Sequence, residues 1–307
     1  MTPGTPRIAI VIVTYNSAQV LEGCLRSLRD GARDTHLVHV VVADNASKDD
    51  TLRIAKEAAD LPMQIVQLGR NAGYAAAINA GVDAVSIDEL DAVLVLNPDC
   101  RLRPGSLLPL AEALRQPGRG ITAPRLVNPD GSLQPSLRRM PTVGRALVEA
   151  LIGGIRAGRI GTLGEMVTAP EEYERPGSAI WATGAAMLIS TDVIRKIGPW
   201  DESFLLYSEE TEYALRALDH GWTLWYEPAS VVEHIGGESS VNPTLAALLT
   251  VNRVRLFQRR RGPLASSAFY CVVLLGEALR ALAGRRTAKA SVVALLRPSR
   301  RLQKLAD

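Results

Sequence analysis

The stretch DAVLVLNPDCRLRPG, residues 91–105, contains an apolar run that ends abruptly in polar residues. The run from Ala92 to Leu96 is rich in valine and leucine and predicts a buried β-strand. Asn97, Pro98 and Asp99 follow it directly. A turn alone explains these residues, because proline and aspartate are common in turns. A ligand site is the alternative, and the neighbouring segments have to decide between the two.

Three further apolar runs precede this strand and alternate with helical patterns. The expected strands cover residues 8–14, 37–43, 63–68 and 92–96, and the expected helices cover 18–28, 49–59 and 73–85. Fully apolar strands separated by helices indicate an α/β fold with a mostly parallel sheet flanked by helices. With right-handed crossovers the usual strand order is 3-2-1-4, so the first and fourth strands are neighbours.

Polar residues follow these strands at the edge of the sheet where the carboxyl ends meet. They are Thr14, Asn16, Asp44, Asn45, Asn97 and Asp99. Ligands of such sheets bind in the crevice outside this edge, where the strand order reverses. Neither G-x-G-x-x-G nor a Walker loop follows the first strand, which disfavours a dinucleotide oxidoreductase or an ATPase. The side chains present are suited to hydrogen-bonding a base and a ribose.

Asp44 opens the segment DNASKDDT, residues 44–51. It is a natural partner for the edge of a pyrimidine base or for sugar hydroxyls. The alternative is purely structural, with Ser47 or Asp49 capping the helix that follows. These residues alone leave both interpretations open.

The segment GRNAGYAAAINAG, residues 69–81, places Asn71 and Gly73 around an expected helix start. The free N–H groups and the dipole at such a start favour a phosphate. The alternative is a turn before a tightly packed alanine helix. That alternative leaves Asn79 unexplained, because asparagine is a poor residue inside a helix.

Acidic residues crowd the start of another expected helix, 209–220. Ser208 can cap this helix, and Glu209, Glu210 and Glu212 complement its dipole. Three carboxylates in four positions exceed what capping needs. Crowding can hold the pKa of one of them near neutrality, which suits a general base.

Asp99 and His234 are candidates for contacts with a metal or a phosphate. A carboxylate can bridge Mg²⁺ or Mn²⁺ to a diphosphate, and the ion would stabilise the charge on a departing diphosphate. His234 stands before a Gly-Gly turn and is one of four histidines. A lone histidine is more often neither a ligand nor a phosphate contact.

The rest of the chain is less regular. Residues 117–180 are rich in glycine, proline and arginine and predict loops with one helix near 143–155. A further helix is expected at 191–197, and a pair of short strands within 222–237. Pro243 opens a helical C-terminal region.

Composition and charge fit a large globular domain with a basic tail. The 307 residues are 47% hydrophobic and 22% charged, and the net charge is +3. Thirteen basic residues lie between Arg253 and the C-terminus, opposed only by Glu277 and Asp307. Such a tail favours an anionic partner surface. Nucleic acid is disfavoured, because no groove-reading motif accompanies the arginines.

The cysteines, the N-terminal apolar run and the segment 268–284 indicate the cellular compartment of the protein. Cys24, Cys100 and Cys271 form neither a disulfide framework nor a metal-spaced cluster, so we expect a reducing cytoplasm. The N-terminal apolar run is interpreted as a first strand rather than a signal peptide. The segment 268–284 is too short and too charged to span a bilayer.

The motifs taken in order resemble the inverting GT-A glycosyltransferases of family 2, in particular their bacterial rhamnosyltransferase-like branch. The matching pieces include IVIVTYNSAQVLEGCLRSL, VVVADNASKDDT, GRNAGYAAAINAG, VLVLNPDC, WATGAAMLIS, GPWDESFLLYSEETEYALRALDHGW and EHIGGES. They cover roughly residues 7–240. The resemblance implies a GT-A (Rossmann-like) catalytic domain over 1–242. The remaining residues, 243–307, would be a basic amphipathic tail that contacts a membrane or another subunit, including a homodimer.

The resemblance also implies roles for individual residues. The donor nucleotide would be bound by Thr14, Asn16, Asp44, Asn45, Asn71, Gly73 and Asn97. Asp99 and His234 would hold Mg²⁺ or Mn²⁺, with Asn97 at the first position of the family's D-x-D element. Glu210 occupies the position of the family's catalytic base, and Glu209 is the alternative for this role. The acceptor and sugar side would comprise Trp181, Gly184, Ala185, Trp200 and Asp201, although Trp200 is at least as easily explained by core packing.

The implied function is a metal-dependent hexosyl transfer with inversion. The base would deprotonate an acceptor hydroxyl, which attacks the anomeric carbon as the nucleoside diphosphate leaves. The expected donor is dTDP-L-rhamnose, and the expected acceptor is a lipid-linked saccharide or polysaccharide of the cell envelope. The expected location is the cytoplasmic face of the plasma membrane, with the tail on anionic lipid. A UDP-hexose or UDP-N-acetylhexosamine transferase and a catalytically silent nucleotide-binding assembly protein are the alternatives.

Overall fold

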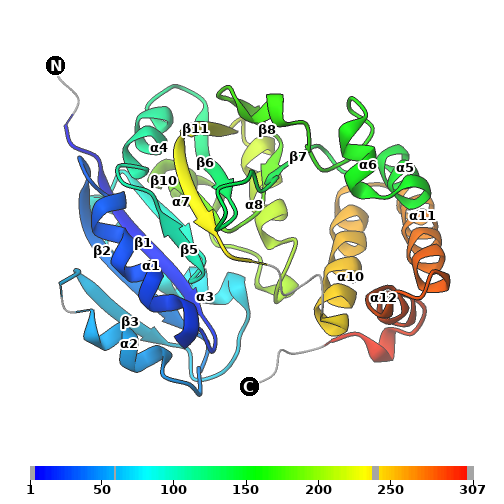
Figure 1. Ribbon diagram of the computed structural model, residues 1–307, viewed down its shortest axis with the longest axis horizontal. Coiled ribbons are helices and arrows are strands. Elements are labelled where there is room, and N and C mark those ends of the chain that lie inside the picture. Colours follow the sequence, from blue (N-terminus) through cyan, green and yellow to red (C-terminus); the bar gives the residue numbers. More distant parts are fainter. Residues whose placement is uncertain (1–3, 59, 237–241, 303–307) are drawn as a thin grey trace.

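The computed structural model describes residues 4–58, 60–236 and 242–302. Its first part alternates strands and helices: β1 (Arg7–Thr14), α1 (Ala18–Gly31), β2 (His36–Asp44), α2 (Thr51–Glu57), β3 (Met63–Gln67), α3 (Tyr74–Asp83), η1 (Ile87–Glu89) and β4 (Ala92–Leu96). The four strands are parallel in the order β3-β2-β1-β4 (Figure 1). This confirms the predicted order and the predicted position of each strand.

The side chains of β1 point alternately to the two faces of the sheet, and both faces are covered by helices. Ile8, Ile10 and Ile12 belong to the core beneath α1 and α4, whereas Ala9 and Val11 belong to the core beneath α3. Successive side chains of a strand point to opposite faces, so a strand without polar residues is buried on both. A Cβ on Gly81 of α3 would lie 2.4 Å from Val11 Cγ1, so this glycine lets helix and strand pack closely.

The second part extends the sheet with strands of mixed direction. Its elements are β5 (Cys100–Leu102), α4 (Leu107–Leu114), β6 (Arg119–Val127), β7 (Leu137–Arg138), α5 (Val143–Ile152), α6 (Gly154–Arg159), η2 (Pro170–Tyr173), β8 (Gly177–Ala179), β9 (Trp181–Ala182), β10 (Ala186–Ser190), α7 (Thr191–Ile197), η3 (Glu202–Phe204), α8 (Glu209–Asp219) and β11 (Thr223–His234). The sheet continues past β4 in the order β10-β6-β11-β5, with β10 antiparallel to both neighbours. β7 and β9 form a separate two-stranded sheet.

Three expectations for this part differ from the structure. Residues 119–127, predicted as loop, form the buried strand β6 between β10 and β11. The pair of short strands expected within 222–237 is one strand, β11, whose register against β6 shifts between Glu227 and Val231. The helix expected near 143–155 is broken at Gly153, which has a φ of 86° and separates α5 from α6.

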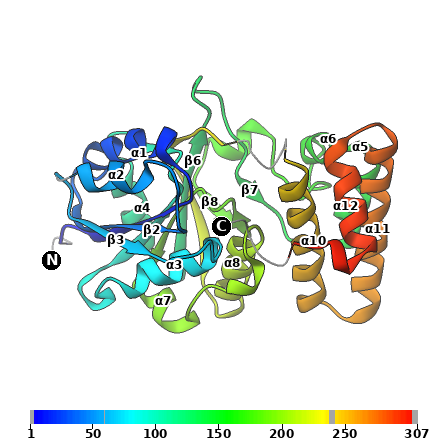
Figure 2. The same ribbon diagram turned by 90° about the horizontal axis from the view of Figure 1, so that it is seen from below.

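The C-terminal region is helical, as predicted, and forms the end of the molecule farthest from β1–β3 (Figures 1 and 2). It comprises α10 (Pro243–Arg260), α11 (Pro263–Leu282), α12 (Arg286–Leu296) and η4 (Pro298–Arg300). These helices share a small core with α5, in which Ala146 meets Phe257 and Phe269. The two phenylalanine rings are stacked with centroids 3.9 Å apart. Helix α5, from the middle of the sequence, therefore packs with the C-terminal helices.

Candidate active site

A cavity of about 1330 Å³ lies at the carboxyl ends of the central strands and extends to α10. Many of the predicted site residues line it, although they are scattered along the sequence. They are Asn16, Asn45, Asn71, Gly73, Asn97, Asp99, Trp181, Gly184, Ala185, Glu209, Glu210 and His234. The structure thus brings candidate nucleotide, metal and catalytic residues around one space.

Asp99 and His234 meet because β5 pairs with the end of β11. The antiparallel register sets His234 opposite Cys100, next to Asp99. His234 Nε2 lies 3.4 Å from Asp99 Oδ1, and the backbone N–H of Gly236 donates to Asp99 Oδ2 at 2.9 Å. Although burial acts to raise the pKa of Asp99, a protonated His234 beside it and the backbone N–H of Gly236 lower it below its usual value. The carboxyl therefore stays ionised.

The free atoms of this pair fit a divalent cation. Asp99 Oδ1 is buried and accepts no hydrogen bond from any described residue. His234 Nδ1 lies 2.6 Å from Gln134 Oε1 and donates its proton there, so a cation that displaces the Nε2 proton would meet the Nε2 lone pair. A carboxylate oxygen and an imidazole nitrogen suit Mn²⁺, and the carboxylate suits Mg²⁺. Cys100 lies within the same cluster, but burial raises its pKa and its thiol donates to Ala185 O.

Two asparagines shape the nucleotide side of the cavity. Asn45 Oδ1 accepts from Ala72 N at 3.0 Å, and its Nδ2 donates to Gly73 O at 3.3 Å. Asn16 has a φ of 50°, and its Oδ1 accepts from Lys48 N at 2.8 Å. Asparagine tolerates such a backbone better than most residues. Both side chains thus hold the loops that border the cavity.

Thr14 and Asp44 are not among the residues that line the cavity, and their contact with the donor nucleotide stays a prediction. Both are completely buried. Asp44 Oδ1 accepts from Thr14 Oγ1 at 2.8 Å and from Ser47 Oγ at 2.6 Å, and Asp44 Oδ2 accepts from Ser47 N at 2.9 Å. The carboxylate is therefore occupied in closing the turn after β2. Asp49 has a similar structural role, because it accepts from Thr51 N and Ala18 N.

Tyr74 is a site residue that the sequence did not single out. Its hydroxyl lies 2.8 Å from Asn97 Oδ1 and 2.9 Å from Gly184 O, and it joins the end of β4 to the segment before β10. Burial raises the pKa of Tyr74 well above its usual value. The phenol therefore remains a neutral donor. An aromatic residue directly after Gly73 at the start of α3 was the only signal for it.

Glu209 and Glu210 begin α8 and face the same cavity. Each has one carboxylate oxygen that is buried and has no hydrogen-bond partner among the described residues. Burial raises the pKa of both carboxyls, and the negative charge of Glu210 raises that of Glu209 further. The positive charge of Arg138 acts in the opposite direction on Glu210. Of the two, Glu210 is therefore the carboxyl that loses its proton more readily.

Arg138 is a second site residue that the sequence missed. It lines the cavity, and its Nη1 donates to the backbone oxygens of Pro135 and Leu137 at 3.0 Å. Its guanidinium lies 5.7 Å from the ring centre of Trp181 and forms no ion pair with another described residue. Burial lowers its pKa from the usual value. A buried cation that lines the cavity and forms no ion pair with a described residue is a candidate for holding an anion.

Strained backbone precedes the two glutamates. Leu205, Tyr207 and Ser208 have φ angles of 56°, 68° and 77°, a region that L-residues seldom adopt. Tyr74 N donates to Leu205 O at 2.7 Å, and a Cβ on Gly73 would lie 2.3 Å from that oxygen. Ser208 makes no side-chain cap to α8, contrary to expectation.

Asn252 of α10 supports this strained turn from the other side. Its Nδ2 lies 2.7 Å from Phe204 O, 2.9 Å from Leu206 O and 3.2 Å from Tyr207 O. Asn252 is itself buried. The turn is thus held between α3 and the C-terminal helices, and α8 begins directly after it.

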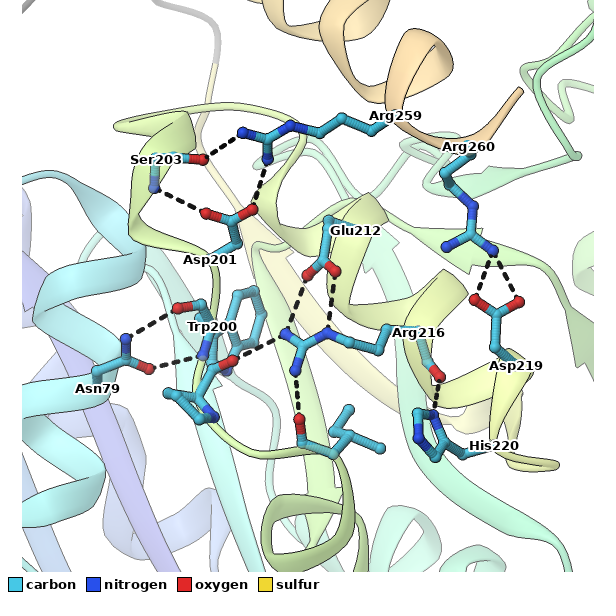
Figure 3. Close-up of polar contacts among 12 residues, drawn as sticks. Asn79, Trp200, Asp201, Ser203, Glu212, Arg216, Asp219, His220, Arg259 and Arg260 are labelled. Atoms are coloured by element: carbon cyan, nitrogen blue, oxygen red, sulfur yellow. Dashed lines mark hydrogen bonds and ion pairs between the residues drawn. The ribbon is translucent and has the colours of Figure 1, made fainter. Parts of the chain in front are cut away.

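Trp200 and Asp201 are not among the residues that line the cavity, and their place on the acceptor side stays a prediction. Trp200 is buried and stacks on Tyr213, with ring centres 4.4 Å apart. Asn79 Oδ1 accepts from Trp200 N at 2.8 Å and Asn79 Nδ2 donates to Trp200 O at 3.0 Å (Figure 3). This pairing explains the asparagine inside α3. Asp201 accepts from Arg259 Nη1 at 2.6 Å and so joins the 200–204 segment to α10.

A mostly parallel sheet flanked by helices, with a cavity at the carboxyl ends of its strands, is the arrangement of the GT-A fold class. GalNAc-T7 bound to UDP, GalNAc and Mn²⁺ has a similar fold, with a TM-score of 0.62 and 16% identity over 83% of this chain and 48% of that one. A mannosyltransferase from Pyrobaculum calidifontis in complex with GDP-Man and Mn²⁺ gives a TM-score of 0.58 and 16% identity, over 97% and 83% of the two chains.

The chain belongs to glycosyl transferase family 2, whose model matches residues 9–166. It is similar to an N-acetylglucosaminyl-diphospho-decaprenol L-rhamnosyltransferase of Mycobacterium tuberculosis. The two are 30% identical over 239 residues, which are 75% of this chain and 76% of that protein. The protein is therefore a glycosyltransferase.

Proposed function

We propose that the protein transfers L-rhamnose from dTDP-L-rhamnose to a hydroxyl of a lipid-diphosphate-linked saccharide in cell-envelope glycan synthesis. The observation that carries this proposal is the convergence of Asp99, His234 and Glu210 on one cavity that also has an apolar end. The similarity to the mycobacterial rhamnosyltransferase supports the choice of sugar and acceptor.

The donor would bind between the strand ends and α3. We assign its nucleotide to the region of Asn16, Asn45, Asn71, Gly73 and Asn97, with Thr14 and Asp44 supporting the surrounding loops from beneath. Asp99 Oδ1 and His234 Nε2 would hold Mg²⁺ or Mn²⁺. When bound, the ion would neutralise charge on the departing diphosphate.

Glu210 would act as the base. Its carboxylate would take the proton of the acceptor hydroxyl as the oxygen bonds to the anomeric carbon. The bond from that carbon to the diphosphate breaks on the opposite side, so the configuration inverts. Gly184 keeps this place open, because a Cβ there would lie 3.2 Å from Glu210 Cβ. Arg138 would favour the ionised form of Glu210, while Glu209 retains its proton.

The acceptor would enter from the side of α10. There the cavity is lined by Leu245, Leu249, Leu256 and Phe257, facing Met140 and Pro141. These side chains suit the first isoprene units of a lipid carrier, and Trp181 suits the saccharide. An acceptor of this kind places the protein at the cytoplasmic face of the plasma membrane, with the basic residues of 243–307 near anionic lipid.

Sugar transfer to a defined acceptor tests the proposal. Purified protein with Mn²⁺ and a short-chain prenyl-diphospho-N-acetylglucosamine would receive dTDP-L-rhamnose, UDP-glucose or UDP-N-acetylglucosamine, with products identified by mass spectrometry. We expect a deoxyhexose addition from dTDP-L-rhamnose alone. Glu210→Gln should lower kcat about a thousandfold with nucleotide binding retained. Transfer from a UDP-sugar instead would contradict the assignment of dTDP-L-rhamnose as the donor. Full activity of Glu210→Gln would contradict the assignment of Glu210 as the base.

A further inference from the structure

Exposed large hydrophobic side chains gather at one end of the molecule. Within the described residues they are Leu147, Leu151, Ile152, Ile155, Ile160, Leu163, Leu264, Leu275, Leu279, Leu282, Val293 and Leu296, together with Ile235 and Leu249, which line the cavity. Apart from those last two, all lie on residues 147–163 or on α11 and α12. Concentrated exposed apolar surface of this kind marks an interaction site.

Helices α5 and α11 form the centre of this surface. They pack side by side, since a Cβ on Gly276 would lie 2.9 Å from Ala150 Cβ. Both lie at the end of the molecule away from the parallel strands (Figures 1 and 2). Leu275, Leu279 and Leu282 recur at helical spacing on the side of α11 opposite the buried Val273 and Gly276.

We define the docking face as residues 147–163 together with 275–282. Leu151 and Ile155 are 63% and 62% exposed, and Leu282 is 86% exposed. Within the described residues, α11 is the one helix long and apolar enough to cross a membrane by length and composition. Its ion pair between Arg280 and Glu277, at 2.7 Å, and its packing on α5 argue against a bilayer-spanning position, so only its C-terminal part, residues 275–282, is assigned to the docking face.

Positive charges border the docking face. Arg156, Arg159, Arg285 and Arg286 are exposed and form no ion pair with another described residue. The acidic residues within 143–165 are Glu149 and Glu165, and both are buried and paired with Arg253 at 2.7 and 2.6 Å. The face is therefore apolar in the middle and cationic at its edge, which complements an anionic lipid surface.

The docking face adjoins the cavity. Gly154, between α5 and α6, lines the cavity, and the next residue, Ile155, is exposed on the face. We propose that residues 147–163 and 275–282 together dock the protein on an anionic bilayer, so that a lipid-linked acceptor reaches the cavity without leaving the membrane. The delivery of the acceptor rests on the proposed function, whereas the docking itself does not. A second copy of the chain fits this face less well, because its arginines would then oppose one another.

Vesicle flotation with the full chain tests the docking. We expect binding to vesicles that contain phosphatidylglycerol, little binding to phosphatidylcholine alone, and a fall in binding with salt. Leu151→Ser/Ile155→Ser should weaken binding about tenfold or more. Arg156→Gln/Arg159→Gln should weaken it about thirtyfold. All four side chains are exposed, so the variants should keep the melting temperature of the parent protein.

A matched pair on α11 gives the sharpest control. Leu264 and Leu282 are both 86% exposed and stand about 27 Å apart along the helix. Leu282→Ser should lose binding, and Leu264→Ser, far from α5, should not. Equal loss in both variants, or no binding of the parent protein, overturns the proposal. So does a dimer by light scattering that Leu151→Ser/Ile155→Ser dissociates. Retained activity of the variants on a water-soluble acceptor separates failure of docking from failure of the proposed function.

Discussion

Asn252 Nδ2 lies 2.7 Å from the backbone oxygen of Phe204, and this contact joins the C-terminal helix α10 to the turn that precedes the two buried glutamates. The same amide also reaches Leu206 O and Tyr207 O. Because Leu205 and Tyr207 have positive φ angles, the turn needs support from its surroundings. The C-terminal helices thus contribute to the geometry of the active site.

Replacing this amide should therefore affect catalysis more than donor binding. Asn252→Leu leaves buried carbonyls without a donor, so we expect a loss of about 2 kcal/mol in the free energy of unfolding. We expect kcat to fall about tenfold, with the KM for the donor little changed. Thr250→Val is the matched control, because Thr250 bonds to Ser291 within the C-terminal helices. It should lower the melting temperature and leave kcat unchanged. Equal kcat in both variants would contradict the positioning role.

The stability of the protein should depend on pH through Glu209. Burial and Glu210 raise the pKa of Glu209 above its unfolded value, so the folded state keeps a proton that the unfolded state loses. The unfolded state is therefore favoured as the pH rises from the usual glutamate pKa towards the raised one. Glu209→Gln removes this penalty and should raise the melting temperature at pH 7 but not at pH 4. A lower melting temperature of the variant at pH 7 would show that the carboxylate stabilises the fold.

Arg138 should set the acid limb of the pH–rate profile. Its positive charge lowers the pKa of Glu210, against the effect of burial. In Arg138→Gln that carboxyl should keep its proton to higher pH, so kcat/KM should rise at a higher pH than in the parent protein. Arg139→Gln is a neighbouring control, because Arg139 pairs with Glu172 at 3.7 Å instead. An acid limb that does not move in Arg138→Gln would separate this arginine from the base.

The parallel half of the fold was predictable, and the mixed half was not. The strands β1 and β4 are almost entirely apolar and β2 and β3 largely so, and right-handed crossovers give their order. The strand β6 reads RGITAPRLV, and its glycine, proline and arginines imitate a loop. Pro124 lies opposite Glu227, next to the register shift in β11, so the irregularity belongs to the pairing of two distant segments. The residues of one segment alone do not indicate how it pairs with a segment far away in the sequence.

The functional site also has a part that the sequence predicted and a part that it did not. The motifs of the sequence predicted a shared site for Asp99, His234 and Glu210, and these residues do line one cavity, whereas their metal and catalytic roles stay predictions. For Trp200 the sequence left core packing open beside a role in the site, and the ring packs on Tyr213. The sequence around Asn252 does not indicate its role. This amide supports the 204–207 turn only because the folded chain packs α10 against that turn.

The most direct test of the shared cavity is the melting temperature of the protein with nucleoside diphosphates. With dTDP at a hundredfold excess over its dissociation constant and Mn²⁺ present, we expect an increase of about 5 °C, and Glu210→Gln should keep it. The increase should disappear when Mn²⁺ is removed and in Asp99→Asn. A shift that needs neither the metal nor Asp99, or no shift with any nucleoside diphosphate, would contradict the account.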